Sequence, residues 1–262
     1  MVSRYVLNHY LAILALFGVS FAGRVQADDT VLNIDSVLYV LDCEMSQCDV
    51  YMQKKEEKLV SLKTLLRQSA DDHHCFALCN ELFEEYKHYQ YDSAYVYAVR
   101  SLRLAEQLQQ PESIALAKSS LIFCYTAVGF YKEADEVNRG FSVEGLTPQM
   151  LEHYYFQCLY LYQNMRDFAV GNDSLWQHYE YLREQARAQV LMNTDKNTDE
   201  YQRNHSKDML SVEFLSPDSM IERRKQLLDK YSLPLHDQAV QYFMIGEMCD
   251  KLGRRTEATY YM

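Results

Sequence analysis

Apolar residues recur at heptad spacing along residues 34–66. One core position of the heptad is occupied by Ile34, Leu41, Cys48, Lys55 and Leu62, and the other by Leu38, Met45, Met52, Leu59 and Leu66. Only Lys55 breaks the apolar stripe, and no Gly or Pro interrupts it. We therefore assign residues 28–70 to an amphipathic helix, whose periodic part is on the order of 50 Å long. A stripe this narrow needs a partner surface, which is either the helices that follow or a second copy in a coiled-coil homodimer through residues 34–66.

Helix-length apolar patterns continue after residue 70 and come in pairs. The predicted pairs are residues 71–89 with 92–108, 111–128 with 131–141 and 148–165 with 174–192, followed by a helix over 216–231 and a last pair that begins at Pro234. The polar residues 193–208 predict a surface loop. The four prolines of the chain, Pro111, Pro148, Pro217 and Pro234, all fall where helices begin. Asp92 and Thr147 are the predicted N-caps of their helices.

The chain has few residues that form turns, and its patterning argues against strands. It holds eight Gly and four Pro among 262 residues. No stretch alternates apolar and polar side chains over the length of a half-buried strand. The predicted fold class is therefore all-α.

Two segments share one spacing of bulky and small residues. In residues 115–141 the positions are Leu121, Ile122, Tyr125, Gly129 and Ala134, and in residues 239–262 they are Tyr242, Ile245, Gly246, Cys249, Gly253 and Ala258. A small residue on the second helix lets the two helices of a pair touch, and Gly permits a left-handed turn between them. This spacing resembles the tetratricopeptide repeat, a 34-residue helix hairpin. The resemblance implies a superhelix of stacked hairpins, an α-solenoid.

The resemblance covers residues 71–262 unevenly. A unit around Leu82, Phe83, Tyr86 and Ala94 fits with one residue missing, and residues 148–192 fit weakly. The motif Leu82-Phe-Glu-Glu-Tyr86, followed by Tyr91-Asp-Ser-Ala94, is similar to exported bacterial tetratricopeptide proteins, some of which continue through a membrane span to a cytoplasmic regulatory segment. Because the last unit stops at Met262 without a capping helix, we expect a truncated chain with any membrane anchor beyond residue 262.

The first 27 residues have the pattern of a signal peptide. Arg4 supplies a positive start, residues 11–23 are apolar, and Val25-Gln26-Ala27 is a small-x-small cleavage signal. We therefore expect export to the periplasm, because the apolar run is shorter than the roughly 20 residues of a membrane span. Removal of this segment takes away Arg4 and Arg24 and leaves 24 basic and 37 acidic side chains, a net charge of −13. That charge opposes direct nucleic acid binding, which relies on clustered Lys and Arg.

A histidine- and cysteine-containing segment suggests a metal site, but its residues do not share a face. On a helix, Cys75 and Cys79 lie with Leu82 on an apolar face, and His73 and His74 fall off it, so we predict no metal site. The chain has seven cysteines, so at least one lacks an internal partner. A disulfide from Cys43 or Cys48 to another segment remains open in an exported protein, and Cys158 is the least anchored candidate nucleophile.

No enzyme motif is present. Gly-rich phosphate loops, a Gly-x-Ser-x-Gly elbow and His-Glu-x-x-His are all missing from the sequence. We therefore predict a protein that is not an enzyme and has no cofactor. The aromatic group Tyr154, Tyr155, Phe156, Tyr160 and Tyr162 is either packed core or a surface on which a ligand stacks.

The resemblance also implies where a protein or peptide partner would bind. In stacked hairpins the first helices line the binding face. The corresponding positions are Asn80, Glu84, Lys87, Ser119, Phe123, Thr126, Phe243, Glu247 and Asp250. They lack the Lys and Asn set with which some family members bind a C-terminal carboxylate. Two functions are thus expected: a periplasmic protein-binding scaffold, or the extracytoplasmic sensor part of a membrane-spanning transcriptional or signalling regulator.

Overall fold

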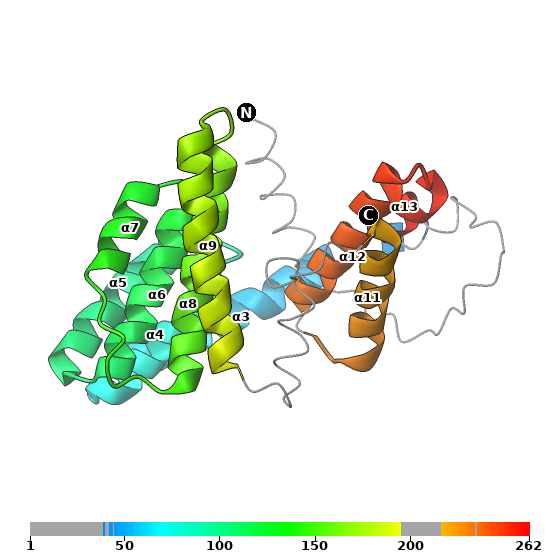
Figure 1. Cartoon of the computed structure of the whole chain (residues 1–262). Coiled ribbons are helices and arrows are strands. Elements are labelled where there is room, and N and C mark those ends of the chain that lie inside the picture. Colours follow the sequence, from blue (N-terminus) through cyan, green and yellow to red (C-terminus); the bar gives the residue numbers. More distant parts are fainter. Residues whose placement is uncertain (1–38, 40–41, 44, 195–215, 234) are drawn as a thin grey trace. The chain divides into compact units, whose positions relative to one another are not determined.

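The structure, a computed structural model, describes residue 39, residues 42–43, 45–194, 216–233 and 235–262 (Figure 1). Among these residues the regular elements are α-helices, as predicted. They are α3 (Cys48–Gln68), α4 (Asp72–Tyr86), α5 (Tyr91–Leu108), α6 (Pro111–Ala127), α7 (Tyr131–Arg139), α8 (Pro148–Phe168), α9 (Asp173–Asn193), α11 (Pro217–Lys230), α12 (Leu235–Lys251) and α13 (Arg255–Tyr261). The predicted signal peptide, Ile34, Leu38, Leu41, Pro234 and most of the predicted loop 193–208 lie outside the described residues.

The chain divides into two compact units, and the predicted repeat region is shared between them. One unit is formed by residues 59–211, and the other by residues 1–58 together with residues 212–262. Each unit is described by itself below.

Helices α8 and α11 each begin with a side-chain N-cap followed by proline. Thr147 and Ser216 are N-caps whose hydroxyls accept from Met150 N and Ser219 N, and each is followed by Pro at the first helical position. The prediction for Asp92 is wrong: the N-cap of α5 is Gln90, two residues earlier, and the helix begins at Tyr91. Asp92 lies in the first turn instead, where its charge favours the positive end of the helix dipole.

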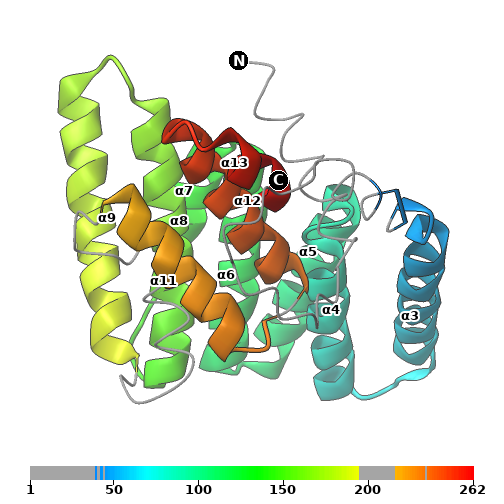
Figure 2. The same ribbon diagram turned by 90° about the vertical axis from the view of Figure 1, so that its right-hand side faces the viewer.

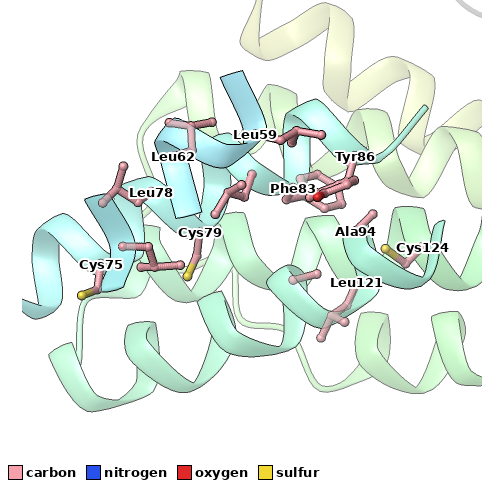
Figure 3. Close-up of a cluster of buried hydrophobic side chains, with 13 residues drawn as sticks. Leu59, Leu62, Cys75, Leu78, Cys79, Phe83, Tyr86, Ala94, Leu121 and Cys124 are labelled. Atoms are coloured by element: carbon pink, nitrogen blue, oxygen red, sulfur yellow. The ribbon is translucent and has the colours of Figure 1, made fainter. Parts of the chain in front are cut away.

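The amphipathic stripe of residues 34–66 does not lie on one uninterrupted helix. Ser46 and Gln47 form a turn before α3 begins at Cys48. Leu59, Leu62 and Leu66 are buried, and their cluster includes side chains of α4, α5 and α6 (Figure 3). The last third of the stripe therefore packs along the helices that follow, the first of the two alternatives. Met45, by contrast, is 57% exposed.

Residues 72–193 form three helix hairpins, each packed on its neighbour. Helix α4 packs on α5, α6 on α7 and α8 on α9, while α5 with α6 and α6 with α8 join one hairpin to the next (Figure 2). Two apolar clusters fill the contacts: the first includes Leu82, Ala94 and Leu121, and the second Ile122 and Leu159. Because Leu121 and Ile122 are neighbours in sequence, α6 joins the two clusters.

The turn inside a hairpin repeats in the two units with the same hydrogen bonds. Gly129 has a φ of 84°, and Phe130 N donates to Tyr125 O at 2.8 Å. In the other unit Gly253 has a φ of 75°, and Arg254 N donates to Cys249 O at 2.9 Å. A left-handed residue that closes a helix in this way is a Schellman turn, which Gly adopts without strain. Both glycines therefore have the left-handed conformation that the turn requires.

Small residues sit where the two helices of a hairpin touch. Ala134 of α7 is fully buried in the cluster that contains Ile122 of α6. In the hairpin of α12 and α13, a Cβ added to Gly246 would lie 3.3 Å from Ala258 O and 2.7 Å from Met262 Cγ. Ala258 is itself 4% exposed. At Ala134 and at Gly246, a larger side chain would therefore collide with the other helix of the hairpin.

Three charged side chains link α8 to α9. The Glu180 carboxylate accepts from Arg166 Nη1 at 2.8 Å and from Arg183 Nε at 3.0 Å. The hydrogen bonds from Arg183 lower the pKa of Glu180 to about 2, with Arg166 acting in the same direction against the opposing effect of burial. Arg166 also lies over the Trp176 ring, 5.7 Å from its centroid.

We expect Ala134→Phe to destabilise the unit formed by residues 59–211. Overpacking a filled core costs about 1–3 kcal/mol, which corresponds to a fall in Tm of about 2–12 °C for a domain of this size. Thermal melting followed by circular dichroism measures the effect. The control is Glu136→Phe on the same helix, because the Glu136 side chain is 64% exposed. Its free energy of unfolding should stay within about 0.5 kcal/mol of the wild type. Equal melting of both variants with the wild type would contradict the packing described here.

The lowered pKa of Glu180 predicts a loss of stability in acid. A carboxyl whose pKa is lower in the folded than in the unfolded chain stabilises the fold above its usual pKa of 4.5, and this contribution disappears as the pH falls towards about 2. Glu180→Gln is therefore expected to lower Tm by about 2–4 °C at neutral pH and to have a smaller effect at about pH 2.5. The exposed Glu136→Gln serves as control. If the Tm difference between Glu180→Gln and the wild type does not become smaller in acid, the lowered pKa assigned to Glu180 is refuted.

Candidate functional site

Phe123 of α6 is the side chain at which the first helices of three hairpins meet. Its ring centroid lies 6.1 Å from that of Phe83 of α4, edge to face, and 5.8 Å from that of Tyr160 of α8, with which it stacks. His88, just after α4, also meets the ring edge-on at 5.8 Å. Phe123 is nevertheless only half-buried. Part of its surface therefore stays exposed.

A small pocket opens beside Phe123. Its cavity volume is about 20 Å³, room for about one water molecule, and it opens into about 220 Å³ of empty space that includes solvent. Helix α4 and its C-cap, α6 and α8 all contribute to its lining, which consists of Phe83, Glu84, Lys87, Ser119, Ser120, Phe123, His153 and Gln157. Aromatic, hydroxyl, amide, imidazole and charged groups thus line one small hollow.

The two charges at the rim of the pocket are paired. Lys87 Nζ lies 2.6 Å from Glu84 Oε2, with exposed fractions of 26% and 54% for the two side chains. The same ammonium lies 5.9 Å from the centroid of the Phe123 ring. This ion pair spans one turn of α4 and its C-cap, and it leaves the rim without a net charge from these two groups.

One hydroxyl of the lining has no hydrogen-bond partner. Ser119 is fully buried, and its Oγ forms no hydrogen bond with the described residues. Its neighbour Ser120 is satisfied within the helix, because its hydroxyl donates to Leu116 O at 3.1 Å. An unpaired buried hydroxyl is uncommon in folded proteins, because it has lost its hydrogen bond to water without gaining another.

A model of the family described as SusR N-terminal TPR domain matches residues 45–262. The chain belongs to this tetratricopeptide family. No curated protein and no solved structure matches it. SusR-type TPR domains share the general property of tetratricopeptide proteins, which serve as scaffolds for protein interactions. None of the helices that the structure describes in this chain is long and apolar enough to cross a membrane.

Four of the predicted groove residues meet in the pocket of this SusR-type domain, namely Glu84, Lys87, Ser119 and Phe123. Asn80 is instead engaged between helices, since its Oδ1 accepts from Ser101 of α5 at 2.8 Å. Thr126 is buried and does not line the pocket. Phe243, Glu247 and Asp250 lie on α12, in the other unit, where Glu247 pairs with Lys251 at 3.0 Å. Of the predicted groove, the part that lies together in one pocket is thus Glu84, Lys87, Ser119 and Phe123.

His153 and Gln157 of α8 were missed by the sequence-based prediction. They lie 34 residues after Ser119 and Phe123, which is the period of the tetratricopeptide repeat. The side chains of residues 148–192 fit the repeat weakly, so the groove positions of the preceding repeat were not mapped onto these residues. The period alone would have found both residues, because the backbone keeps the repeat where the side chains do not.

The aromatic group of α8 is divided between packing and the pocket. Tyr154 is buried and stacks on Phe141 with centroids 4.0 Å apart. Its hydroxyl donates to Asn138 Oδ1 of α7, and Asn138 Nδ2 donates to the Tyr162 hydroxyl at 2.8 Å. Burial raises the pKa of both tyrosines, that of Tyr162 to about 12. Tyr160 of this group stacks on Phe123 beside the pocket.

The cysteines are free thiols, and five of them are buried, namely Cys75, Cys79, Cys124, Cys158 and Cys249. Burial raises the pKa of Cys158 to about 12, so it is a thiol rather than a nucleophilic thiolate at neutral pH. His73 and His74 lie in the first turn of α4, where their backbone N–H groups donate to the Asp71 carboxylate. In the described part of the chain no group of three or more His, Cys, Asp or Glu side chains is placed to hold a metal ion.

Proposed function

We propose that this domain is a non-enzymatic scaffold, exported to the periplasm, that binds a protein or peptide segment in the pocket around Phe123. The observation that carries the proposal is the half-buried Phe123 ring, on which α4, α6 and α8 converge. Stacked hairpin repeats bind partners on the face formed by their first helices. Aromatic side chains in such central positions contribute a large share of binding energy.

The chemistry of the pocket favours binding over catalysis. Its lining holds a serine and a histidine, which in another arrangement would suggest nucleophilic catalysis. Ser119 Oγ, however, forms no hydrogen bond with the described residues, so no base is in position to activate it. Export is supported by the signal-peptide pattern of the first 27 residues.

We expect Phe123→Ala to abolish most peptide binding. Random peptides displayed on phage are selected on the wild-type chain, and the affinity of the selected peptides is measured by isothermal titration calorimetry. Loss of a central aromatic contact costs about 2 kcal/mol or more, which is a loss of about thirtyfold or more in affinity.

Phe130→Ala is the matched control for this experiment. Phe130 is 55% exposed, lies in the turn after α6 and does not line the pocket. It should leave the affinity unchanged, and circular dichroism should show both variants folded. A selection that yields only peptides insensitive to Phe123→Ala would show that the pocket is not the binding site.

A second function is supported by the name of the family. The matching family is described as the N-terminal domain of SusR, so in SusR a further part of the chain follows the repeats. This supports the hypothesis that the present domain is the extracytoplasmic sensor part of a membrane-spanning transcriptional or signalling regulator. Under that hypothesis the partner bound at Phe123 is the signal.

The sensor hypothesis predicts the coding sequence downstream of residue 262. An apolar segment of about 20 residues should follow, long enough to cross a bilayer as a helix, with a regulatory segment after it. Determining the sequence of the complete open reading frame provides the measurement. A stop codon directly after residue 262 would exclude the sensor role and leave the scaffold proposal intact.

A further inference from the structure

The turn between α8 and α9 carries apolar side chains that the fold leaves uncovered. Phe168 and Val170 are 77% and 79% exposed, and Leu175 and Trp176 in the first turn of α9 are exposed as well. These four residues are called the α8–α9 tip below. We propose that the α8–α9 tip docks this domain on a lipid bilayer whose headgroups are zwitterionic. The proposal is independent of the partner that binds beside Phe123.

The α8–α9 tip is convex. Helices α8 and α9 have 21 residues each, against 17 in α6 and 9 in α7, and the α8–α9 turn extends beyond the turn of the neighbouring hairpin (Figure 1, Figure 2). Tyr131 of that hairpin meets Phe168 edge-on from below, with ring centroids 5.8 Å apart. A Cβ added to Gly171 in the turn would meet no atom within 4 Å. Such a tip offers no groove for a partner, but it can enter a medium that yields around it.

The size of the α8–α9 tip favours a bilayer over a protein partner or a second copy of the chain. A specific protein interface buries about 800 Å² of each partner and takes about 20–30 residues a side. The tip supplies four residues around one turn. Adsorption to a bilayer needs only a few apolar side chains, because each one gains free energy separately when it leaves water. Tryptophan in particular is enriched at the level of the headgroups.

The charges around the tip favour headgroups without a net charge. Residues 168–172 hold no charged side chain. Behind them, Arg166 pairs with Asp167 at 2.9 Å and with Glu180 at 2.8 Å, so its charge is already balanced. The chain as a whole has 37 acidic against 26 basic side chains. An anionic bilayer would repel this excess of negative charge, whereas a zwitterionic bilayer does not.

Trp176 is the single tryptophan of the chain, so its fluorescence reports on the tip alone. The test titrates residues 28–262 with vesicles of phosphatidylcholine and phosphatidylethanolamine, since the apolar run of residues 11–23 would bind vesicles by itself. Brominated phosphatidylcholine, which quenches a tryptophan that it touches, shows whether the indole reaches the lipid. Val170→Asp is compared with the wild type. The control is the identical change Val96→Asp, at a 58% exposed position of α5, and circular dichroism checks that both variants are folded.

Trp176 emission should shift to the blue on addition of vesicles and should be quenched by the brominated lipid, because the indole moves from water to the headgroup region. Val170→Asp should weaken the partition into vesicles by about tenfold or more, the effect of removing one apolar side chain from the interface. Val96→Asp should partition like the wild type. Phosphatidylglycerol in the vesicles should not tighten binding, because it adds negative charge.

Three outcomes overturn the proposal. In the first, vesicles leave the Trp176 emission unchanged. In the second, binding requires phosphatidylglycerol or is as strong for Val170→Asp as for the wild type, which assigns the contact to another surface. In the third, the blue shift appears without lipid as the protein concentration rises, which shows that a second copy covers the tip. Peptide binding beside Phe123 is measured separately, so the scaffold proposal stands in all three cases.

Discussion

Close contact between the two helices of each hairpin is the constraint on which the rest of this structure depends. At Ala134 the contact is made by a methyl group, and at Gly246 by a backbone with no side chain at all. A left-handed glycine at residue 129 or 253 closes the helix before it. Because the turns are short and only small residues separate its two helices, each hairpin is a thin pair of helices. It presents an apolar surface that only another hairpin can cover. Stacking follows from that requirement.

Stacking in turn positions the pocket. Because α6 contributes Leu121 to one apolar cluster and Ile122 to the next, it lies between two hairpins. Its third face carries Ser119 and Phe123 towards α4 and α8. The pocket therefore needs no loop and no insertion, since it is formed where three first helices lie next to one another. Rigid helices hold its aromatic walls in place.

Polar groups stabilise the same helices without entering the pocket. Asn138 of α7 joins two tyrosines of α8, and Glu180 of α9 joins two arginines, one of them Arg166 of α8. Hydrogen bonds of this kind fix the rotation of α8 about its axis, and that rotation decides which side chains of α8 face Phe123. Ser119 is an exception, because its buried hydroxyl forms no hydrogen bond with the described residues.

The sequence by itself determined the helices, their starts at proline and the hairpins of residues 111–141 and 235–261, because local spacing and Gly or Pro conformation are properties of neighbouring residues. The repeat placed Phe123, Ser119, Glu84 and Lys87 on the face formed by the first helices, and its 34-residue period points to His153 and Gln157 as well. Tertiary structure alone decided that Asn80 and Thr126 do not line the pocket and that the heptad stripe is broken at Ser46. Those outcomes depend on which side chains of separate helices reach one another, and no periodicity within a single helix contains that information.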